Sequence, residues 1–294
     1  MSTLYELTNE ERLHFGLVPI VDSWDKKILS DAIILYFEGD KIVKIQKHDY
    51  GYLEYDTDID TIDRQILLPK TSRGKQQKLT IPRILKIKGS GAQFRGSFQG
   101  GGITVYDNRR NIFFIKGFVE EGRISNYQDI KNWITNYIAN IPPDYFKWLH
   151  NQLGKKPEKI KVKEGDIIAF KISQTEYGLA RILFDLSAQR KKNDILWPDA
   201  SWIYSKSLII AAYAYYIDNL NIDVDSIVTK KTLPAIYIFD TDVHNGQFAI
   251  IGHKELSQHD RQIPRPKGNE SYITVPYTKT DIQTFIAING TEQN

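Results

Sequence analysis

Hydrophobic and polar residues alternate over most of the first half of the chain, a pattern that predicts antiparallel β-sheet. Strands are expected at residues 32–37, 41–46, 64–68, 103–106 and 112–116. The first two flank Glu38-Gly39-Asp40 as the arms of a hairpin would. Before them a short helix is expected, because Thr8 and Glu11 have capping-box spacing and Gly16 is a typical helix stop.

The hydrophobic period changes between residues 126 and 153. Ile130, Trp133, Ile134, Tyr137 and Ile138 recur at the spacing of one helix face. A second short helix is expected after Pro142-Pro143. Because the following residues, Gly154-Lys155-Lys156-Pro157, have the composition of a linker, we predict two domains, 1–154 and 155–294.

The strand pattern resumes after this linker. Strands are expected at 160–162, 167–172, 179–186, 235–239, 248–251, 272–275 and 284–288, with a long apolar run after Trp202. Residues 187–207 read as a long loop. The predicted fold class is therefore α+β and predominantly β: two domains of antiparallel sheet with a short helical segment between them. The second domain is expected to be small and barrel-like, or strongly twisted.

Composition narrows the class of protein. The chain has 294 residues, 41% of them hydrophobic and 26% charged, which suits a globular protein with a large core. Because cysteine is absent, disulfides, thiolate metal sites and cysteine nucleophiles are excluded. Neither a secretory signal nor an apolar run of membrane-spanning length is readable, so a cytoplasmic location and no membrane partner are expected.

The charge is nearly balanced. The net charge of +3 comes from 39 basic and 36 acidic residues, and the pI is about 8.7. A partner dominated by phosphate usually requires a higher pI, so a nucleic-acid partner is not expected. Two basic clusters, at 155–163 and 190–192, are interpreted as solvated faces, with nucleic-acid contact as the minority interpretation.

An acidic motif follows the strand at 235–239. Asp240 and Asp242 resemble the first motif of haloacid-dehalogenase phosphatases, in which they would be nucleophile and acid–base. Only about fifty residues follow them, too few for the strands that this fold still requires, so a polar turn is the preferred interpretation. His244 nearby suggests a metal ligand, but Asn245 stands where a calcium loop requires glycine.

Several other motifs are incomplete. Asp56, Asp58 and Asp60 fail the same calcium-loop test at Thr61 and are expected to form a solvated turn. The glycine cluster at 89–102 lacks a phosphate-loop lysine and a dinucleotide fingerprint. Neither a zinc-binding histidine pair nor a nucleophile elbow is present. We therefore expect no catalytic residue, no metal and no cofactor.

The most informative stretch is 160–186, followed by 233–256. Its motif residues are Gly165, Asp166, Tyr177, Gly178, Ala180 and Arg181, with Gly246 and Gly252 farther along. Their order and spacing resemble the Imm26 immunity-protein family over about residues 160–256. One departure is Ala180, where glycine is expected.

The resemblance implies a protein that binds and neutralises a cognate toxin of a bacterial polymorphic toxin system, without catalysis. Two alternatives remain open: an RNA-acting toxin ribonuclease of a small β-barrel fold, and a nucleic-acid-binding module. For the toxin-binding surface we predict Tyr177, Arg181, Trp197 and Trp202, because such side chains on scaffold loops are frequent binding anchors.

Overall fold

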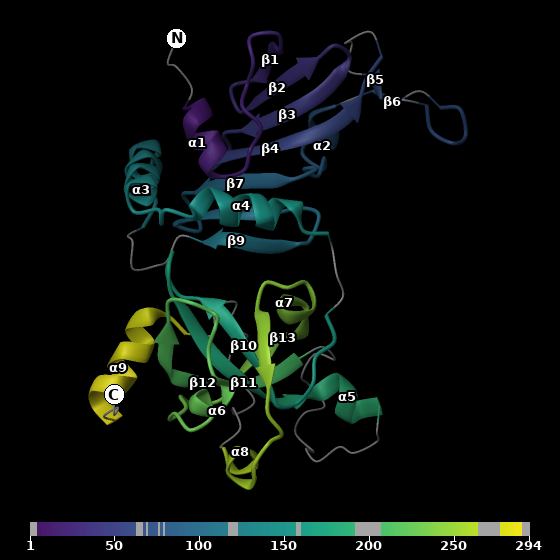
Figure 1. Ribbon diagram of the computed structural model, residues 1–294. Helices are drawn as coiled ribbons and strands as arrows, with labels where there is room; N and C mark the ends of the chain where they lie inside the picture. The colour runs from purple at the N-terminus through teal and green to yellow at the C-terminus, as the bar shows by residue number, and fades with distance from the viewer. Residues whose placement is uncertain are drawn as a thin grey trace. The chain divides into compact units, whose positions relative to one another are not determined.

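A computed structural model describes residues 5–62, 67–68, 70–75, 77–78, 80–116, 123–156, 160–191, 207–263 and 277–289. The chain divides into two compact units, Met1–Lys156 and Pro157–Asn294, called here the N-terminal and C-terminal units. Each contains its own antiparallel sheet (Figure 1).

The N-terminal unit is built on a seven-stranded antiparallel sheet. In spatial order its strands are β1 (Asp25–Ser30), β2 (Ile33–Glu38), β3 (Lys41–Lys47), β4 (Gly51–Asp60), β7 (Ala92–Ser97), β8 (Gly102–Asp107) and β9 (Ile112–Lys116). A separate hairpin pairs β5 (Leu67–Leu68) with β6 (Gln77–Lys78). The helices are α1 (Asn9–His14), α2 (Ile81–Ile84), α3 (Tyr127–Ala139) and α4 (Tyr145–Gly154). The expected capping box is present, because Thr8 and Glu11 bond reciprocally at the start of α1.

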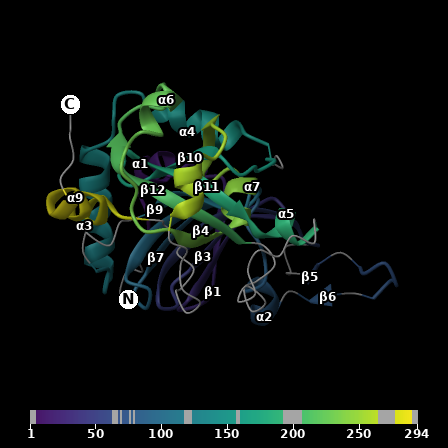
Figure 2. The same cartoon turned by 90° about the horizontal axis from the view of Figure 1, so that it is seen from below.

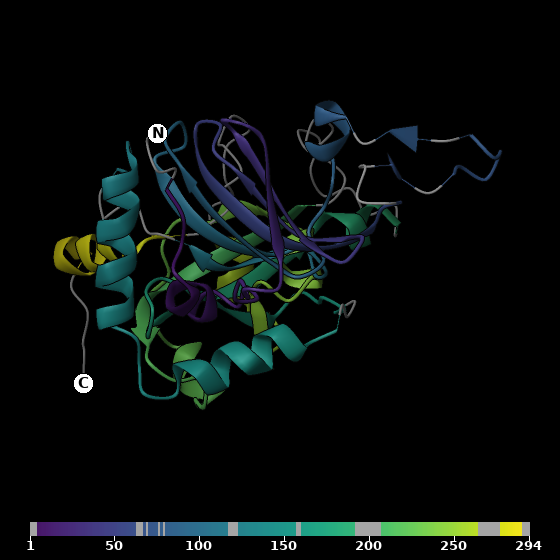
Figure 3. The same ribbon diagram turned by 90° about the horizontal axis from the view of Figure 1, so that it is seen from above.

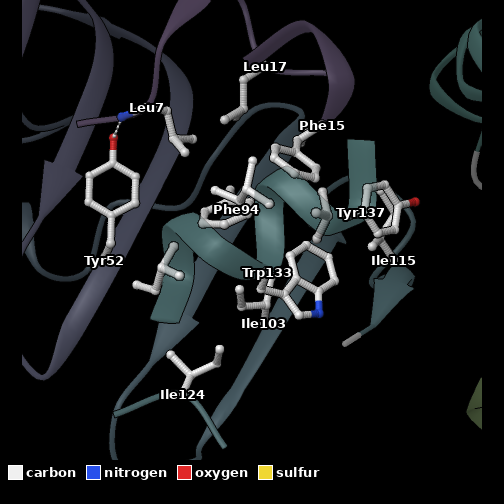
Figure 4. Close-up of a cluster of buried hydrophobic side chains, with 14 of the residues drawn as sticks. Leu7, Phe15, Leu17, Tyr52, Phe94, Ile103, Ile115, Ile124, Trp133 and Tyr137 are labelled. Atoms are coloured by element: carbon white, nitrogen blue, oxygen red, sulfur yellow. Dashed lines mark hydrogen bonds between the residues drawn. The ribbon is translucent and has the colours of Figure 1, made fainter. Parts of the chain in front are cut away.

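Aromatic side chains form the core between this sheet and α3. Phe94 of β7 contacts Phe15, which follows α1, at a ring-centroid distance of 4.8 Å. Trp133 and Tyr137 stack on each other from successive turns of α3 (Figure 4). The predicted helix face is confirmed, since Ile130, Trp133, Ile134 and Tyr137 are all buried.

A polar network is buried beside that aromatic core. Lys44 of β3 and Glu54 of β4 are both 0% exposed, and Arg12 of α1 is 3% exposed. The Lys44 Nζ lies 2.9 Å from Glu54 Oε1 and 2.5 Å from Asp56 Oδ1, and Arg12 Nε donates to Glu54 Oε1 at 2.8 Å. Burial opposes ionisation of Glu54, but the charges of Lys44 and Arg12 outweigh it and lower the pKa of the carboxyl.

The C-terminal unit is built on a five-stranded antiparallel sheet. In spatial order its strands are β13 (Ile236–Phe239), β12 (Ser207–Ile217), β11 (Tyr177–Asp185), β10 (Asp166–Lys171) and β14 (Ala249–His253). Its helices are α5 (Leu186–Lys191), α6 (Val224–Ile227), α7 (Asp240–His244), α8 (Gln258–Gln262) and α9 (Lys279–Asn289). Among the described residues the sheet is open, with β13 and β14 at its edges. It does not close into the barrel that was one of the two expected forms.

Both faces of this second sheet are covered. Val243 of α7 and Ile282 of α9 pack on one face, and Ile227 of α6 and Ile263, which follows α8, pack in clusters on the other. Helix α9 lies beside β12 (Figures 1 and 2). The nearly continuous apolar sequence of β12 is explained by this arrangement, because a strand covered on both faces has no solvent-facing positions to make polar.

The fold class is confirmed as α+β with two antiparallel sheets, but two local predictions are wrong. Residues 284–288 form part of α9, not a strand: Ile282, Phe285 and Ile286 recur at helical spacing and face the core. Residues 160–162 pair with no strand of the sheet as described; the Ile160 amide donates to the His244 carbonyl instead. The predicted strands at 64–68, apart from β5, and at 272–275 lie outside the described residues.

The two acidic turns are also corrected. Asp56, Asp58 and Asp60 lie on strand β4, which pairs with β3 along its length, and Lys41 and Lys44 offset their charges. Asp240 and Asp242 begin helix α7 rather than a turn. Among the described helices, none has the length and apolarity needed to cross a membrane.

Candidate functional site

The first motif pair forms a tight turn at one end of the five-stranded sheet. Gly165 has φ +92°, and its amide donates to the Ile182 carbonyl at 2.7 Å. A Cβ here would lie 2.4 Å from the Lys254 carbonyl oxygen, so the position requires glycine. The Asp166 carboxylate accepts from the Lys163 amide at 2.8 Å and so closes the turn.

A histidine bridges this turn to the end of β14. His253 Nδ1 lies 2.8 Å from Asp166 Oδ1, and its Nε2 lies 3.2 Å from Glu255 Oε1. The bond to Asp166, followed by the bond to Glu255, raises the pKa of His253. The imidazole is partly exposed while Asp166 is buried, so this end of the sheet presents a histidine held between two carboxylates.

Arg181 is buried in the middle of β11 and fixes the segment that follows β14. Its Nη1 donates to Asp260 Oδ2 at 2.8 Å, and its Nη2 donates to the carbonyls of Lys254 and Glu255, both at 2.7 Å. Its carboxylate partner is thus Asp260, which also caps α8 by accepting from the Ser257 amide. Because Arg181 is only 3% exposed, it acts as a positioning residue for this segment.

The remaining motif glycines each permit a close approach or a left-handed turn. A Cβ on Gly178 would lie 2.6 Å from the Phe170 ring, and one on Gly252 would lie 2.3 Å from Val224 Cγ2. Gly246 has φ +78°, which favours glycine. The three positions therefore have a structural explanation that does not depend on a ligand.

Of the four predicted toxin-binding residues, the structure describes Tyr177 and Arg181. Tyr177 is the first residue of β11, and Lys171 Nζ lies 5.7 Å from its ring centroid. Residues 186–206 follow Asp185, at the other end of this strand. Nine residues of strand place these two ends about 26 Å apart. Trp197 and Trp202 lie outside the described residues.

The acidic motif of α7 shows one close pair. His244 Nε2 lies 3.4 Å from Asp240 Oδ2, and the other ring nitrogen, Nδ1, contacts the Ile160 carbonyl. These contacts tie α7 to the segment before β10. In the part of the chain that the structure describes, no group of three or more His, Cys, Asp or Glu side chains is arranged to hold a metal ion.

Residues 163–272 match the model of the family Imm26, Immunity protein 26. The predicted resemblance is thereby confirmed, and the match contains the Gly165 turn, Arg181 and His253. No curated protein and no solved structure matches the chain. We call residues 163–272 the Imm26-like segment.

Sequence reasoning missed His253 and Asp260 as partners of the motif residues. Asp260 lies 79 residues after Arg181, so no local spacing connects the two. The sequence gives a partial signal for Asp260, because Ser257 and Asp260 have the spacing of a capping box. The structure shows that they form one at the start of α8. That signal predicts the helix but not its ion pair with Arg181.

Proposed function

We propose that the protein is an immunity protein of a bacterial polymorphic toxin system, whose Imm26-like segment binds and neutralises a cognate toxin in the cytoplasm without catalysis. The observation that carries this proposal is the family match over residues 163–272. A binding inhibitor needs a rigid surface rather than a set of reacting groups, and the Arg181 contacts supply such rigidity.

Within this proposal the toxin contacts the sheet end that carries the Gly165 turn. There Arg181 holds the backbone of Lys254 and Glu255, and the Glu255 side chain is 92% exposed. The chain also leaves this end toward Trp197 and Trp202, which we retain as proposed anchors. Loops held on a rigid sheet are a common recognition surface.

The test uses the toxin domain encoded beside this gene, co-expressed with the full chain. We expect the wild-type protein to restore growth and to co-purify with the toxin. Glu255→Lys should weaken binding at least tenfold without changing the melting temperature, because the side chain is exposed. Trp197→Ala or Trp202→Ala should each weaken binding about thirtyfold if the residue is an anchor.

Tyr177→Ala is the matched control, because Tyr177 lies at the opposite end of β11. Weakened binding in this variant, with Glu255→Lys unaffected, would move the interface to that end. Failure of the wild-type protein to protect against the toxin would remove the proposed function. RNA hydrolysis that is lost in Asp240→Asn without unfolding would support the ribonuclease alternative instead.

A further inference from the structure

The near-neutral total charge conceals a strongly basic segment in the N-terminal unit. Between Asp63 and Asp107 the sequence contains nine Lys and Arg residues and no Asp or Glu. The other 30 of the 39 basic residues share the rest of the chain with all 36 acidic ones. Without this segment the remaining chain is therefore net acidic, so the positive charge is concentrated in one place.

Five of these nine cations lie on a projecting hairpin and on the chain after α2. Figure 3 shows the hairpin of β5 and β6 extending beyond the sheet of its own unit. Lys70, Arg73 and Lys75 are exposed at its tip, and Lys86 and Lys88 are exposed after α2. We call these five residues the basic surface.

The tip of the hairpin is an ordered turn. The Thr71 amide donates to the Lys75 carbonyl at 2.9 Å, and the Gly74 amide donates to the Thr71 carbonyl at 2.8 Å. Gly74 has φ +74°, so the turn uses the left-handed conformation that glycine adopts without strain. Arg73 and Lys75 are thus held on either side of a closed turn.

The cations of the basic surface differ from other exposed lysines of the same unit. None of the five forms an ion pair with any residue that the structure describes, in contrast to Lys26 and Lys41 on the same unit, which pair with Glu6 and Asp58. Five like charges of one segment, without ion-pair partners among the described residues, raise the local potential and favour a polyanionic partner.

The composition of the segment favours nucleic acid over an acidic protein. No Phe, Tyr or Trp occurs between Asp63 and Phe94, so the segment lacks the aromatic anchors on which protein interfaces and base stacking depend. It is rich instead in Lys, Arg, Ser, Thr and Gln, the side chains that bond phosphate oxygens.

We propose that the basic surface binds the phosphodiester backbone of nucleic acid, independently of base sequence. The contacts are phosphate oxygens with Lys70, Arg73 and Lys75 at the hairpin tip and with Lys86 and Lys88 after α2. This binding does not depend on the toxin binding proposed for the C-terminal unit, and either proposal can fail while the other stands.

The experiment measures fluorescence anisotropy of a labelled poly-uridine RNA of about 20 nucleotides and of a DNA duplex of similar length, with the full chain between about 50 and 200 mM salt. The wild-type protein is expected to bind with an affinity that falls steeply as salt rises. The triple variant Lys70→Gln/Arg73→Gln/Lys75→Gln should bind about 100-fold more weakly at 0.1 M salt, since each phosphate contact adds roughly 0.7 to the salt slope on a single strand. The two probes distinguish a single-stranded from a duplex target.

The matched control is Lys155→Gln/Lys156→Gln/Lys161→Gln, which removes the same charge from exposed positions in the other basic cluster. This control should bind within about threefold of wild type and keep its salt slope. Absence of salt-dependent binding, or loss of binding in the control but not in the hairpin variant, would overturn the proposal. Equal binding of poly-glutamate of matched charge would also overturn it and assign the surface to an acidic protein. Thermal melting verifies that both variants remain folded.

Discussion

The two sheets of this protein treat polar residues in opposite ways. In the N-terminal unit, one sheet face buries Lys44 and Glu54 beneath Arg12 of α1. In the C-terminal unit, the central strands are apolar on both faces, and the buried ion pair of Arg181 with Asp260 holds a connecting segment in place. An apolar strand can pack against many partners. A buried charge, by contrast, destabilises the fold when its specific ion-pair partner is removed. We therefore expect substitutions of buried charges to be more costly in the first unit.

The largest effect is expected from Glu54→Gln. This change leaves Lys44 and Arg12 buried with one fewer carboxylate, and breaking a buried ion pair costs about 3–5 kcal/mol. Hydrogen exchange of peptides from the full chain should show the loss in the N-terminal unit. Asp58→Asn is the control, since the Asp58 side chain is 65% exposed and should contribute no more than about 1 kcal/mol. Equal losses in the two variants would contradict a buried network.

The sequence predicts β3, one strand of this network, but it predicts neither β4 nor the buried face that the two strands share. Alternation correctly predicts the hairpin of β2 and β3, yet the polar positions Lys44 and Gln46 read as solvent-facing when both are fully buried. Their burial depends on Arg12 and Glu6, which approach from more than 30 residues upstream. Periodicity reports which residues share a face, and only tertiary contacts decide what covers it.

The same limit applies to the candidate site. Gly165 and Asp166 are recognisable from sequence because a turn is local, and the structure confirms a glycine in the left-handed region there. The role of Arg181 is not recognisable, because its partners are two carbonyls and a carboxylate more than 70 residues away. The sequence of residues 284–288 predicts a strand because β-branched residues dominate it, while the helix is fixed by packing of Ile282 and Phe285.

The second-largest effect on stability is expected from Arg181→Met. The methionine fills the volume but leaves Asp260 and two carbonyls without their donor, at a cost of about 2–3 kcal/mol. The loss should appear as faster hydrogen exchange in residues 253–263. Arg261→Met is the matched control, because Arg261 is exposed on the neighbouring helix. Unchanged exchange in Arg181→Met would show that the segment is held by other contacts.

A smaller effect is expected from Gly252→Ala. The new methyl would lie 2.3 Å from Val224 Cγ2, and overpacking of this kind costs about 1–2 kcal/mol if the valine can shift. Gly154→Ala should have the opposite effect on stability. A Cβ at this position meets nothing within 4 Å, and alanine at the end of α4 should stabilise the protein by up to about 1 kcal/mol. Urea unfolding measures the free energy of unfolding of both variants. If Gly252→Ala were more stable than wild type, the close approach of α6 to β14 would be refuted.

The smallest effect concerns His253 and depends on pH. Because Asp166 and Glu255 raise the pKa of His253 above 6.5, the folded protein binds its proton more tightly than the unfolded chain. The resulting stabilisation is complete below pH 6.5 and is lost as the pH rises through the raised pKa. It should not exceed about 1 kcal/mol, since the imidazole is partly exposed.

Comparing the stability of wild type and His253→Gln across this pH range isolates the contribution. The difference should be largest at acidic pH and should shrink as the imidazole deprotonates. In an Asp166→Asn background the trend should shrink as well, because the main cause of the raised pKa is removed. A difference that grows toward alkaline pH would mean that the fold favours neutral His253, which would contradict a pKa raised by the two carboxylates.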